Sequence, residues 1–204
     1  MKKRFIILLV LSCLLFQNCR SWTITQITNT NAPISPKLPA LQKGSIYGQP
    51  IYTPGMAYYN TDIGTIFTEE VENNLTDPFG EVYGTINYHT NMIQMKIGIG
   101  YALVSGFTMM VPNLLGFPMG NYKIELETIV EIRNVKNELI GKYKATGKGK
   151  ASVAMYFGYG SVTALRKARA DALNNCLINI RVQIQQDVLR LTTELKNAKA
   201  VTGN

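Results

Sequence analysis

The side chains that most often carry out chemistry are sparse in this sequence of 204 residues. His89 is its single histidine, which excludes a multi-histidine metal site, and no acid–base partner stands beside it. Gly98-Ile-Gly100 lacks the third glycine of a nucleotide-binding loop, and Gly147-Lys-Gly149 lies inside an expected strand rather than a phosphate-binding loop. We therefore expect no catalytic residue, no cofactor and no metal ion. An enzyme is the third-ranked hypothesis, because carboxylates distant in sequence could still converge.

The first 19 residues predict export from the cytoplasm. Met1-Lys-Lys-Arg4 is basic, and Phe5 to Phe16 is almost wholly apolar. This is the pattern of a signal peptide, and the apolar run is too short to span a bilayer comfortably. The segment resembles a lipoprotein signal, in which a lipid-modified cysteine, here Cys19, becomes the first residue of the mature chain. It departs from the usual pattern because Phe16, Gln17 and Asn18 replace leucine and small residues.

We predict a signal peptide over residues 1–18 and lipidation of Cys19. Cys13 fits the local pattern about as well, but it would leave an apolar region of only Phe5 to Val10. The alternatives are an ordinary cleaved signal near Cys19 and an uncleaved anchor. Arg20 stands where an aspartate would indicate inner-membrane retention, so the expected location is the outer membrane, facing the periplasm. Cys176 should be a buried thiol, and no disulfide is expected.

Charge and proline content describe the segment that follows. The net charge of +8 falls to +5 when Lys2, Lys3 and Arg4 are removed with the signal. Nucleic acid is not an expected partner outside the cytoplasm, whereas anionic lipid or lipopolysaccharide phosphate is one alternative to a merely soluble surface. Residues 19–45 contain Pro33, Pro36 and Pro39 and predict an extended, lipidated tether, followed by a single α+β domain over residues 46–199.

A charged hairpin is the clearest element of this domain. Residues 122–133 alternate as a half-buried strand, with one set formed by Tyr122, Ile124, Leu126, Thr128, Val130 and Ile132. Residues 134–137 supply a turn, and residues 139–156 alternate again with Lys142, Lys144, Lys148 and Lys150 on one face. Pairing would place an acidic row beside this lysine row. The face is then either a solvated surface or a basic surface for an anionic partner such as lipid headgroups.

A long amphipathic helix should follow Gly158-Tyr-Gly160, with Ser161 as its cap. Apolar residues recur at steps of three and four: Leu165, Ala168, Ala172, Cys176, Ile180, Ile184, Val188, Leu191 and Leu195. Its small N-terminal residues suit close packing on a sheet. At about 1.5 Å per residue the helix would extend roughly 50 Å and overhang a small sheet. The overhang would pack on the N-terminal half of the chain or meet a partner helix.

The order of these elements resembles that of uncharacterised Gram-negative envelope lipoproteins. The residues concerned are the charged hairpin with its Lys144-Ala-Thr-Gly-Lys-Gly149 strand, the Gly-Tyr-Gly break and the alanine-rich helix opening over Ala164 to Leu173. More loosely, the stretch from Met95 to Gln186 is similar to the periplasmic domain of the curli-secretion lipoprotein channel. That resemblance implies an outer-membrane assembly or export component without catalytic residues, and it assigns no individual functional residue.

Two further segments have more than one interpretation. Residues 46–59 contain Tyr47, Tyr52, Tyr58 and Tyr59 among turn formers, which favours a loop packed on a sheet over a sugar-binding site. A strand is expected over residues 81–90. Farther along the chain, residues 97–122 carry no charged side chain. They are predicted to continue as a strand to about Ser105 and then a loop or short helix turning at Pro112 and Pro118. This segment is a buried part of the domain, a loop inserted in a membrane or partner, or a true membrane span.

The sequence thus predicts an antiparallel sheet with a long C-terminal helix packed on one face. The predicted function is that of a membrane-anchored envelope lipoprotein with a structural or assembly role, which contacts the membrane through its N-terminal lipid and an envelope protein or a second copy of itself. The alternative is a periplasmic lipoprotein that binds a lipid or a glycan.

Overall fold

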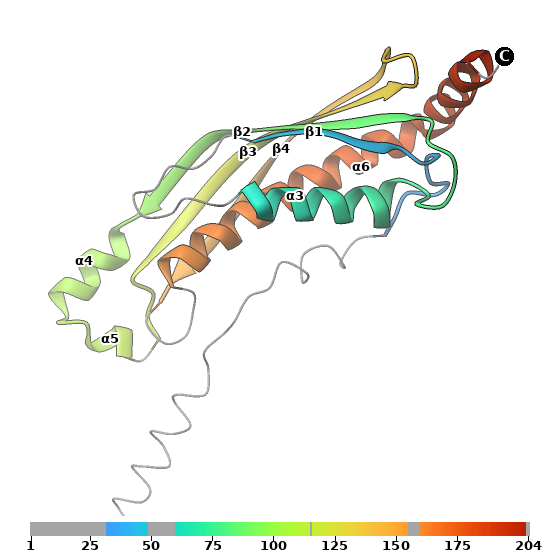
Figure 1. The fold of residues 1–204 in the computed structure, drawn as a ribbon. Helices are drawn as coiled ribbons and strands as arrows, with labels where there is room; N and C mark the ends of the chain where they lie inside the picture. Colours follow the sequence, from blue (N-terminus) through green and yellow to red (C-terminus); the bar gives the residue numbers. More distant parts are fainter. Residues whose placement is uncertain (1–31, 49–59, 115, 155–159, 203–204) are drawn as a thin grey trace, which may run out of the picture.

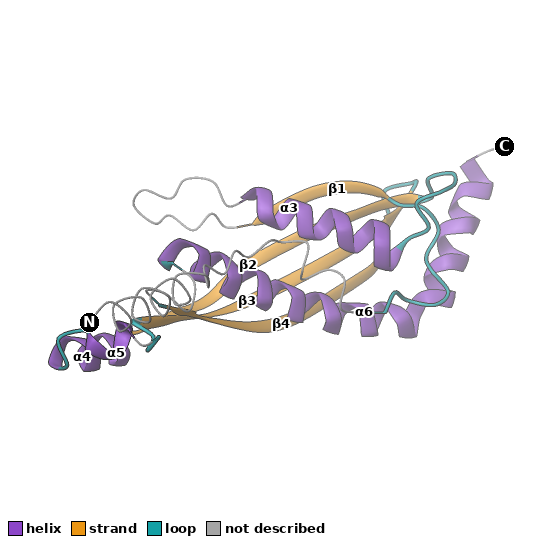
Figure 2. Ribbon diagram, turned by 90° about the horizontal axis from the view of Figure 1, so that it is seen from below, coloured by secondary structure: helices purple, strands orange, loops and turns teal. Residues whose placement is uncertain are grey.

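The computed structural model describes residues 32–48, 60–114, 116–154 and 160–202. Four strands form one sheet in the order β1 (Gln42–Gly48), β2 (Gly84–Gly98), β3 (Gly120–Asn134) and β4 (Leu139–Val153). The helical elements are α3 (Asn60–Glu69), the π-helix η1 (Glu70–Leu75), α4 (Gly100–Phe107), α5 (Val111–Leu114) and α6 (Ser161–Thr202). Helices α3 and α6 lie on the same face of the sheet (Figures 1 and 2). The α+β class is confirmed, and the sheet is mixed because β1 runs parallel to β2 while the other pairs are antiparallel.

The β3–β4 hairpin forms as its alternation predicts. Asn137 has a positive φ of 64° in the turn, and the Asn134 side chain accepts hydrogen bonds from the backbone N–H groups of Lys136 and Glu138. The predicted apolar set of β3 faces the core from Ile124 onwards. On the opposite face, the acidic and lysine rows pair as expected: Glu131 with Lys142 at 2.9 Å, Glu127 with Lys144 at 2.7 Å and Glu125 with Lys148 at 3.6 Å.

Helix α6 packs directly on β4 because two glycines leave room for its backbone. A Cβ atom on Gly147 would lie 2.1 Å from the Ala172 carbonyl oxygen, and one on Gly149 would lie 1.9 Å from that of Ala168. All nine residues of the predicted apolar stripe are buried. Cys176 is among them, as expected, and its Sγ lies 3.5 Å from the Leu126 carbonyl oxygen.

The C-terminal part of α6 packs against its own chain, which decides between the two interpretations of the overhang. The sheet is larger than expected, because its strands of 15 residues are about 50 Å long. Helix α6 is about 63 Å long, so most of it lies beside the sheet. Leu195 is fully buried. Lys199 then donates a hydrogen bond of 2.6 Å to Glu81 and lies over the ring of Tyr83.

Helix α3 and η1 form a layer that the sequence analysis missed. Residues 62–80 are mixed and polar in sequence, with turn formers at residues 77–80, and no helix is expected there. Their buried positions nevertheless follow a helical period: Ile63, Ile66, Phe67, Glu70, Val71, Asn74 and Leu75. The carboxylate of Glu70 lies on this stripe and accepts two hydrogen bonds from Arg181 of α6, so a buried ion pair joins the two helical elements.

The domain begins earlier than the predicted boundary between residues 45 and 46, which falls within β1. Ile34, Leu38 and Leu41 belong to the hydrophobic core, and the backbone of Leu38 pairs with Leu75 and Asp77. The last part of the predicted tether is therefore a structural part of the domain, because its apolar residues cover α3 and η1. The signal peptide, Cys19, the tyrosine-rich residues 49–59 and the Gly158-Tyr159 break lie outside the described residues.

Side chains of α6 also cover the outer edge of the sheet. Asn175, Gln183 and Arg190 donate hydrogen bonds to the backbone carbonyl groups of Lys148, Lys144 and Ile140, respectively. These carbonyls belong to β4, which is an edge strand of the sheet that the described residues form. The contacts occupy acceptors that another chain would need to extend the sheet at this edge.

The close approach of α6 to β4 predicts a selective effect of alanine. Gly149→Ala should lower the free energy of unfolding by about 1–3 kcal/mol, because the added methyl group must displace the α6 backbone. Gly64→Ala is the matched control, since its Cβ in α3 would meet nothing within 4 Å and alanine favours a helix. Urea denaturation measures both variants. Equal effects of the two substitutions would contradict this account of the packing.

Candidate functional site

Helices α4 and α5 project from one end of the sheet, between β2 and β3 (Figure 1). We call residues 97–119 the tip. Phe107 and Met109 are 89% and 88% exposed, and the other large apolar side chains exposed here are Ile97, Ile99, Leu103, Val104, Met110, Val111 and Leu114. The predicted strand to Ser105 is wrong, because β2 ends at Gly98 and a helix follows. The interpretation as a buried segment is also wrong, because the apolar side chains face outwards.

The two buried residues among those described in the tip are polar. They are Ser105 and Asn113, with 3% and 0% of their surface exposed. The Ser105 hydroxyl donates to the Tyr101 carbonyl at 2.8 Å, and the Asn113 side chain donates to the Phe117 carbonyl at 3.0 Å. Most of the large apolar side chains of the tip therefore face outwards, while Tyr101 and Phe117 are partly buried and pack edge to face with their ring centroids 5.6 Å apart.

Two residues with positive φ join the helices of the tip. Met109 and Met110 have φ values of 51° and 61°, which non-glycine residues adopt at a cost. The N–H of Met110 bonds the Ser105 carbonyl at 2.7 Å, so the end of α4 is closed by its own backbone. This turn holds the exposed methionines at the outermost part of the loop. Among the described residues, no helix is both long and apolar enough to cross a membrane.

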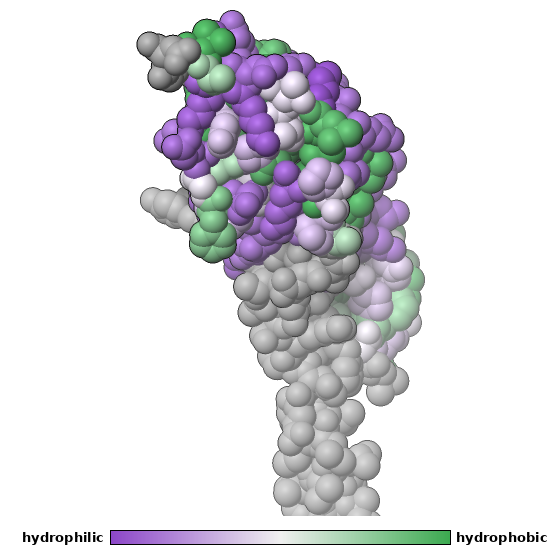
Figure 3. All heavy atoms as spheres, turned by 90° about the vertical axis from the view of Figure 1, so that its right-hand side faces the viewer, coloured by the Kyte–Doolittle hydropathy of each residue, from purple (hydrophilic) through white to green (hydrophobic). Residues whose placement is uncertain are grey.

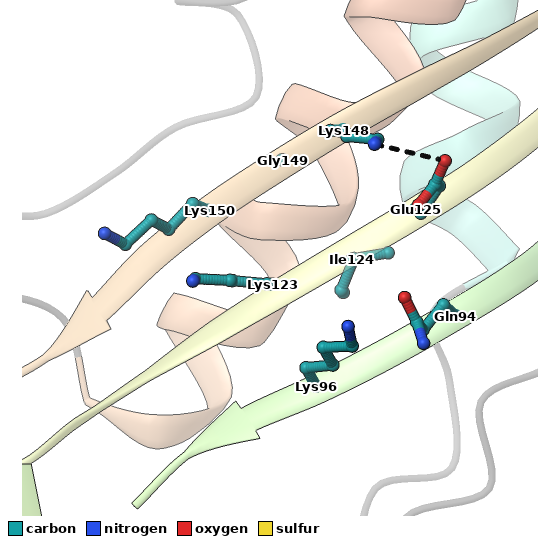
Figure 4. A pocket seen from close by; sticks show the side chains of 8 residues that line it. All are labelled: Gln94, Lys96, Lys123, Ile124, Glu125, Lys148, Gly149 and Lys150. Atoms are coloured by element: carbon teal, nitrogen blue, oxygen red, sulfur yellow. Dashed lines mark ion pairs between the residues drawn. The ribbon is translucent and has the colours of Figure 1, made fainter. Parts of the chain in front are cut away.

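Three lysines form a row across the sheet next to the tip. Lys96 of β2 pairs in register with Lys123 of β3, which pairs with Lys150 of β4. They line a hollow of about 280 Å³ together with Gln94, Ile124, Glu125, Lys148 and Gly149 (Figure 4). Within the described residues, none of the three ammonium groups forms an ion pair, whereas Lys148 beside them pairs with Glu125. Like charges directly opposite each other destabilise a sheet.

A bulge in β2 brings Lys96 into this row. His89 and Asn91 face the open side of the sheet, so strict alternation would direct Lys96 towards α6. The register shifts between Met92 and Gln94, which inserts one extra residue and turns Gln94 and Lys96 to the open side. The lysines of β4 are evident from the sequence but the row is not, because the alternation predicts a strand that ends at Thr90 and the bulge has no clear sequence signal.

The opposite end of the sheet has a different surface. It faces the viewer in Figure 3, where hydrophilic residues predominate among the coloured atoms. The β3–β4 turn there exposes Lys136, Asn137 and Glu138. His89 is exposed on the open sheet face, with its ring 5.0 Å from that of Tyr47. The row of unpaired lysines thus lies beside the apolar tip, whereas Phe79, Val135 and Leu139 are exposed apolar side chains of the opposite end.

The groups with perturbed pKa values lie away from this end and are explained by packing. Burial raises the pKa of Tyr88 well above its ordinary value, with a further contribution from the Glu70 carboxylate. Burial likewise raises the pKa of the Cys176 thiol, which makes it a poor nucleophile. Hydrogen bonds from Arg190 and then Tyr143 lower the pKa of Asp187. In the part of the chain that the structure describes, no three His, Cys, Asp or Glu side chains are grouped to hold a metal ion.

Comparison with known proteins identifies no relative: no protein-family model matches the chain, and no curated protein matches its sequence. The resemblance to the curli-secretion lipoprotein channel therefore stays a prediction.

The charged face predicts a pH-dependent effect of one substitution. A hydrogen bond from Lys142 is the main cause that lowers the pKa of Glu131 below 4.5, and Arg133 adds to it. In Lys142→Met this pKa should rise. A carboxyl group whose pKa is lowered by folding stabilises the folded state at pH values above its ordinary pKa. The variant, which loses this contribution, should therefore be less stable by up to about 1 kcal/mol at neutral pH. This difference should vanish as the pH falls through the lowered pKa of Glu131.

These effects are measured by carboxyl NMR titration and by urea denaturation. Both are carried out between about pH 2 and 7, the range in which carboxyl groups titrate. Lys136→Met is the control, since this exposed lysine lies in the turn away from Glu131. An unchanged pKa of Glu131 in Lys142→Met would contradict the assignment of the pair.

Proposed function

We propose that this chain is a lipid-anchored protein of the outer membrane that faces the periplasm and has a structural or assembly role. The signal pattern and Cys19 support the anchor. The observation that carries the role is the exposed, uncharged tip, because contiguous apolar surface of this kind marks sites of interaction. The mechanism is attachment and presentation: the lipid fixes the position of the domain, and the sheet with α6 holds the contact surface rigidly.

The contact surface is the tip rather than α6. The apolar stripe of α6 is buried in the core, and Lys199 beyond it contacts Glu81 and Tyr83, so the stripe offers no unpartnered face for another helix. At the outer edge of the sheet, α6 side chains occupy carbonyl acceptors of β4. The proposed partners are the membrane, and an envelope protein or a second copy of the chain. The resemblance to the curli-secretion lipoprotein channel supports a component of an assembly.

The second candidate is a protein that binds an individual lipid or glycan. The row of Lys96, Lys123 and Lys150 favours it, because three ammonium groups around one hollow suit a phosphate on such a ligand. Native mass spectrometry of protein extracted in mild detergent tests this candidate. A bound phosphorylated lipid or glycan that is lost in Lys123→Gln would support it, and a ligand-free spectrum from every detergent would contradict it.

The anchor is tested by substitution of each cysteine in the N-terminal region. We expect denaturing mass spectrometry to give a mature chain that begins at Cys19 and carries acyl mass. Cys19→Ser should release the protein from sedimented membranes, because the buried acyl chains contribute about 0.8 kcal/mol per CH₂. Cys13→Ser is the matched control and should stay lipidated. Lipidation that depends on Cys13, or a mature chain without acyl mass, would contradict the proposal.

The assembly role is tested in intact cells with an amine-reactive crosslinker. We expect covalent species larger than the monomer, either homo-oligomers or complexes with another envelope protein, and native mass spectrometry should give matching masses. A chain that stays monomeric in both measurements would contradict an assembly role while leaving the lipid anchor untouched.

A further inference from the structure

We propose that the tip inserts into the surface of an anionic lipid bilayer, with α4 and α5 among the acyl chains and Lys96, Lys123 and Lys150 at the lipid phosphates. The inference deepens the proposed function by naming what the tip contacts. It rests on that function only for the lipid anchor, because the contacts of the tip are argued from the described residues alone.

The distribution of polarity in the tip is that of a segment surrounded by lipid. Ser105 and Asn113 are buried and bonded to backbone carbonyls, while Phe107 and Met109 are almost fully exposed. Much of the backbone of the tip is paired within α4, α5 and the turn between them. Backbone groups that enter an apolar medium must be satisfied internally, and these short helices and their turn satisfy a large part of them without spanning the bilayer.

The lysine row lies at the depth of the headgroups if the tip is inserted. Lys96, Lys123 and Lys150 are two or three residues from the strand ends Gly98, Gly120 and Val153. At about 3.3 Å per residue the row stands about 7–10 Å behind the base of the tip. The headgroup layer on each side of a bilayer is about 5–8 Å thick, which long lysine side chains reach.

Charge complementarity selects a bilayer that carries anionic lipids. Residues 97–122 contain no Asp or Glu, so no carboxylate of the tip would enter the apolar layer. The three ammonium groups repel one another across β2, β3 and β4 and have no ion-pair partner among the described residues. Lipid phosphates would relieve this repulsion, and each lysine at an anionic surface favours binding by roughly fivefold. A neutral surface would gain only the apolar contacts.

The chain before the described domain is long enough for the lipid anchor and the tip to share one bilayer. The Ala32 carbonyl accepts a hydrogen bond from Arg181, and the nearby Gln183 bonds Lys144, so the chain enters the domain near the middle of β4. That point is about 30 Å from the end of β4 at Val153. The 13 residues from Cys19 to Ala32 span at most about 45 Å.

Bilayer insertion is measured by fluorescence on the full mature protein, purified from its own membrane and placed in vesicles. Phe107→Trp in a Trp22→Phe background supplies a single tryptophan at an exposed position of the tip. The vesicles contain phosphatidylcholine alone or with phosphatidylglycerol, with bromine on the acyl chains. We expect Trp fluorescence at position 107 to shift to the blue and to be quenched in the phosphatidylglycerol vesicles.

Two charge-matched variants test the lysine row. Lys96, Lys123 and Lys150 replaced together by glutamine should lower the insertion constant about 100-fold. The control replaces Lys37, Lys136 and Lys196, which are exposed lysines elsewhere on the domain. It should insert normally. The first variant should be at least as stable as the wild type in urea, because it removes repulsion between strands.

Three results would overturn the proposal. The first is that phosphatidylglycerol vesicles do not quench the tryptophan at position 107, and the second is that the two lysine variants insert equally. The third is crosslinking at position 107 between two copies, which would show that the tip is shielded by self-association. A missing acyl group at Cys19 would instead overturn the anchor and would leave quenching of the tip intact, so the two failures are distinguishable.

Discussion

The close contact between the backbone of α6 and strand β4 is the constraint on which the fold depends. Gly147 and Gly149 have no side chains, and the carbonyl groups of Ala168 and Ala172 occupy the space that Cβ atoms would take. The helix can therefore lie against the edge strand along most of its length. Its apolar stripe then covers the inner face of β3 and β4, and its polar side chains reach the β4 carbonyls. The N-terminal residues, α3 and η1 complete the same layer over β1 and β2.

With one face covered, the other face of the sheet is free to carry charge. Along most of the hairpin the acidic side chains of β3 neutralise the lysines of β4, which is the arrangement expected of a solvated surface. The pattern ends at Lys123, where lysine replaces the acidic partner, and the β2 bulge adds Lys96 beside it. The unpaired positive charge is therefore local, and it lies at the end of the sheet from which the apolar tip projects.

The two features at that end are complementary in a way that neither explains alone. The exposed apolar side chains of the tip do not stabilise the fold in water, and a row of opposed lysines weakens the sheet. Together they match the layers of a membrane surface, in which apolar chains lie beneath anionic headgroups. At such a surface the exposed apolar side chains would contact acyl chains and the opposed lysines would contact lipid phosphates. Both features are unfavourable in the free protein and favourable there, which is the physical argument for placing the tip at a membrane surface.

The sequence by itself determined the hairpin, the stripe of α6 and the buried Cys176, because strict periods of 2 and 3.6 residues report burial directly. The tertiary structure decided the rest. Helix α3 and η1 escaped notice because Glu70 on their buried face is neutralised by Arg181, 111 residues away. The lysine row required a bulge and the alignment of three strands. In the tip most large apolar side chains are exposed, so composition alone could not distinguish a buried segment from an exposed one. Only the position of α4 and α5 beyond the end of the sheet did so.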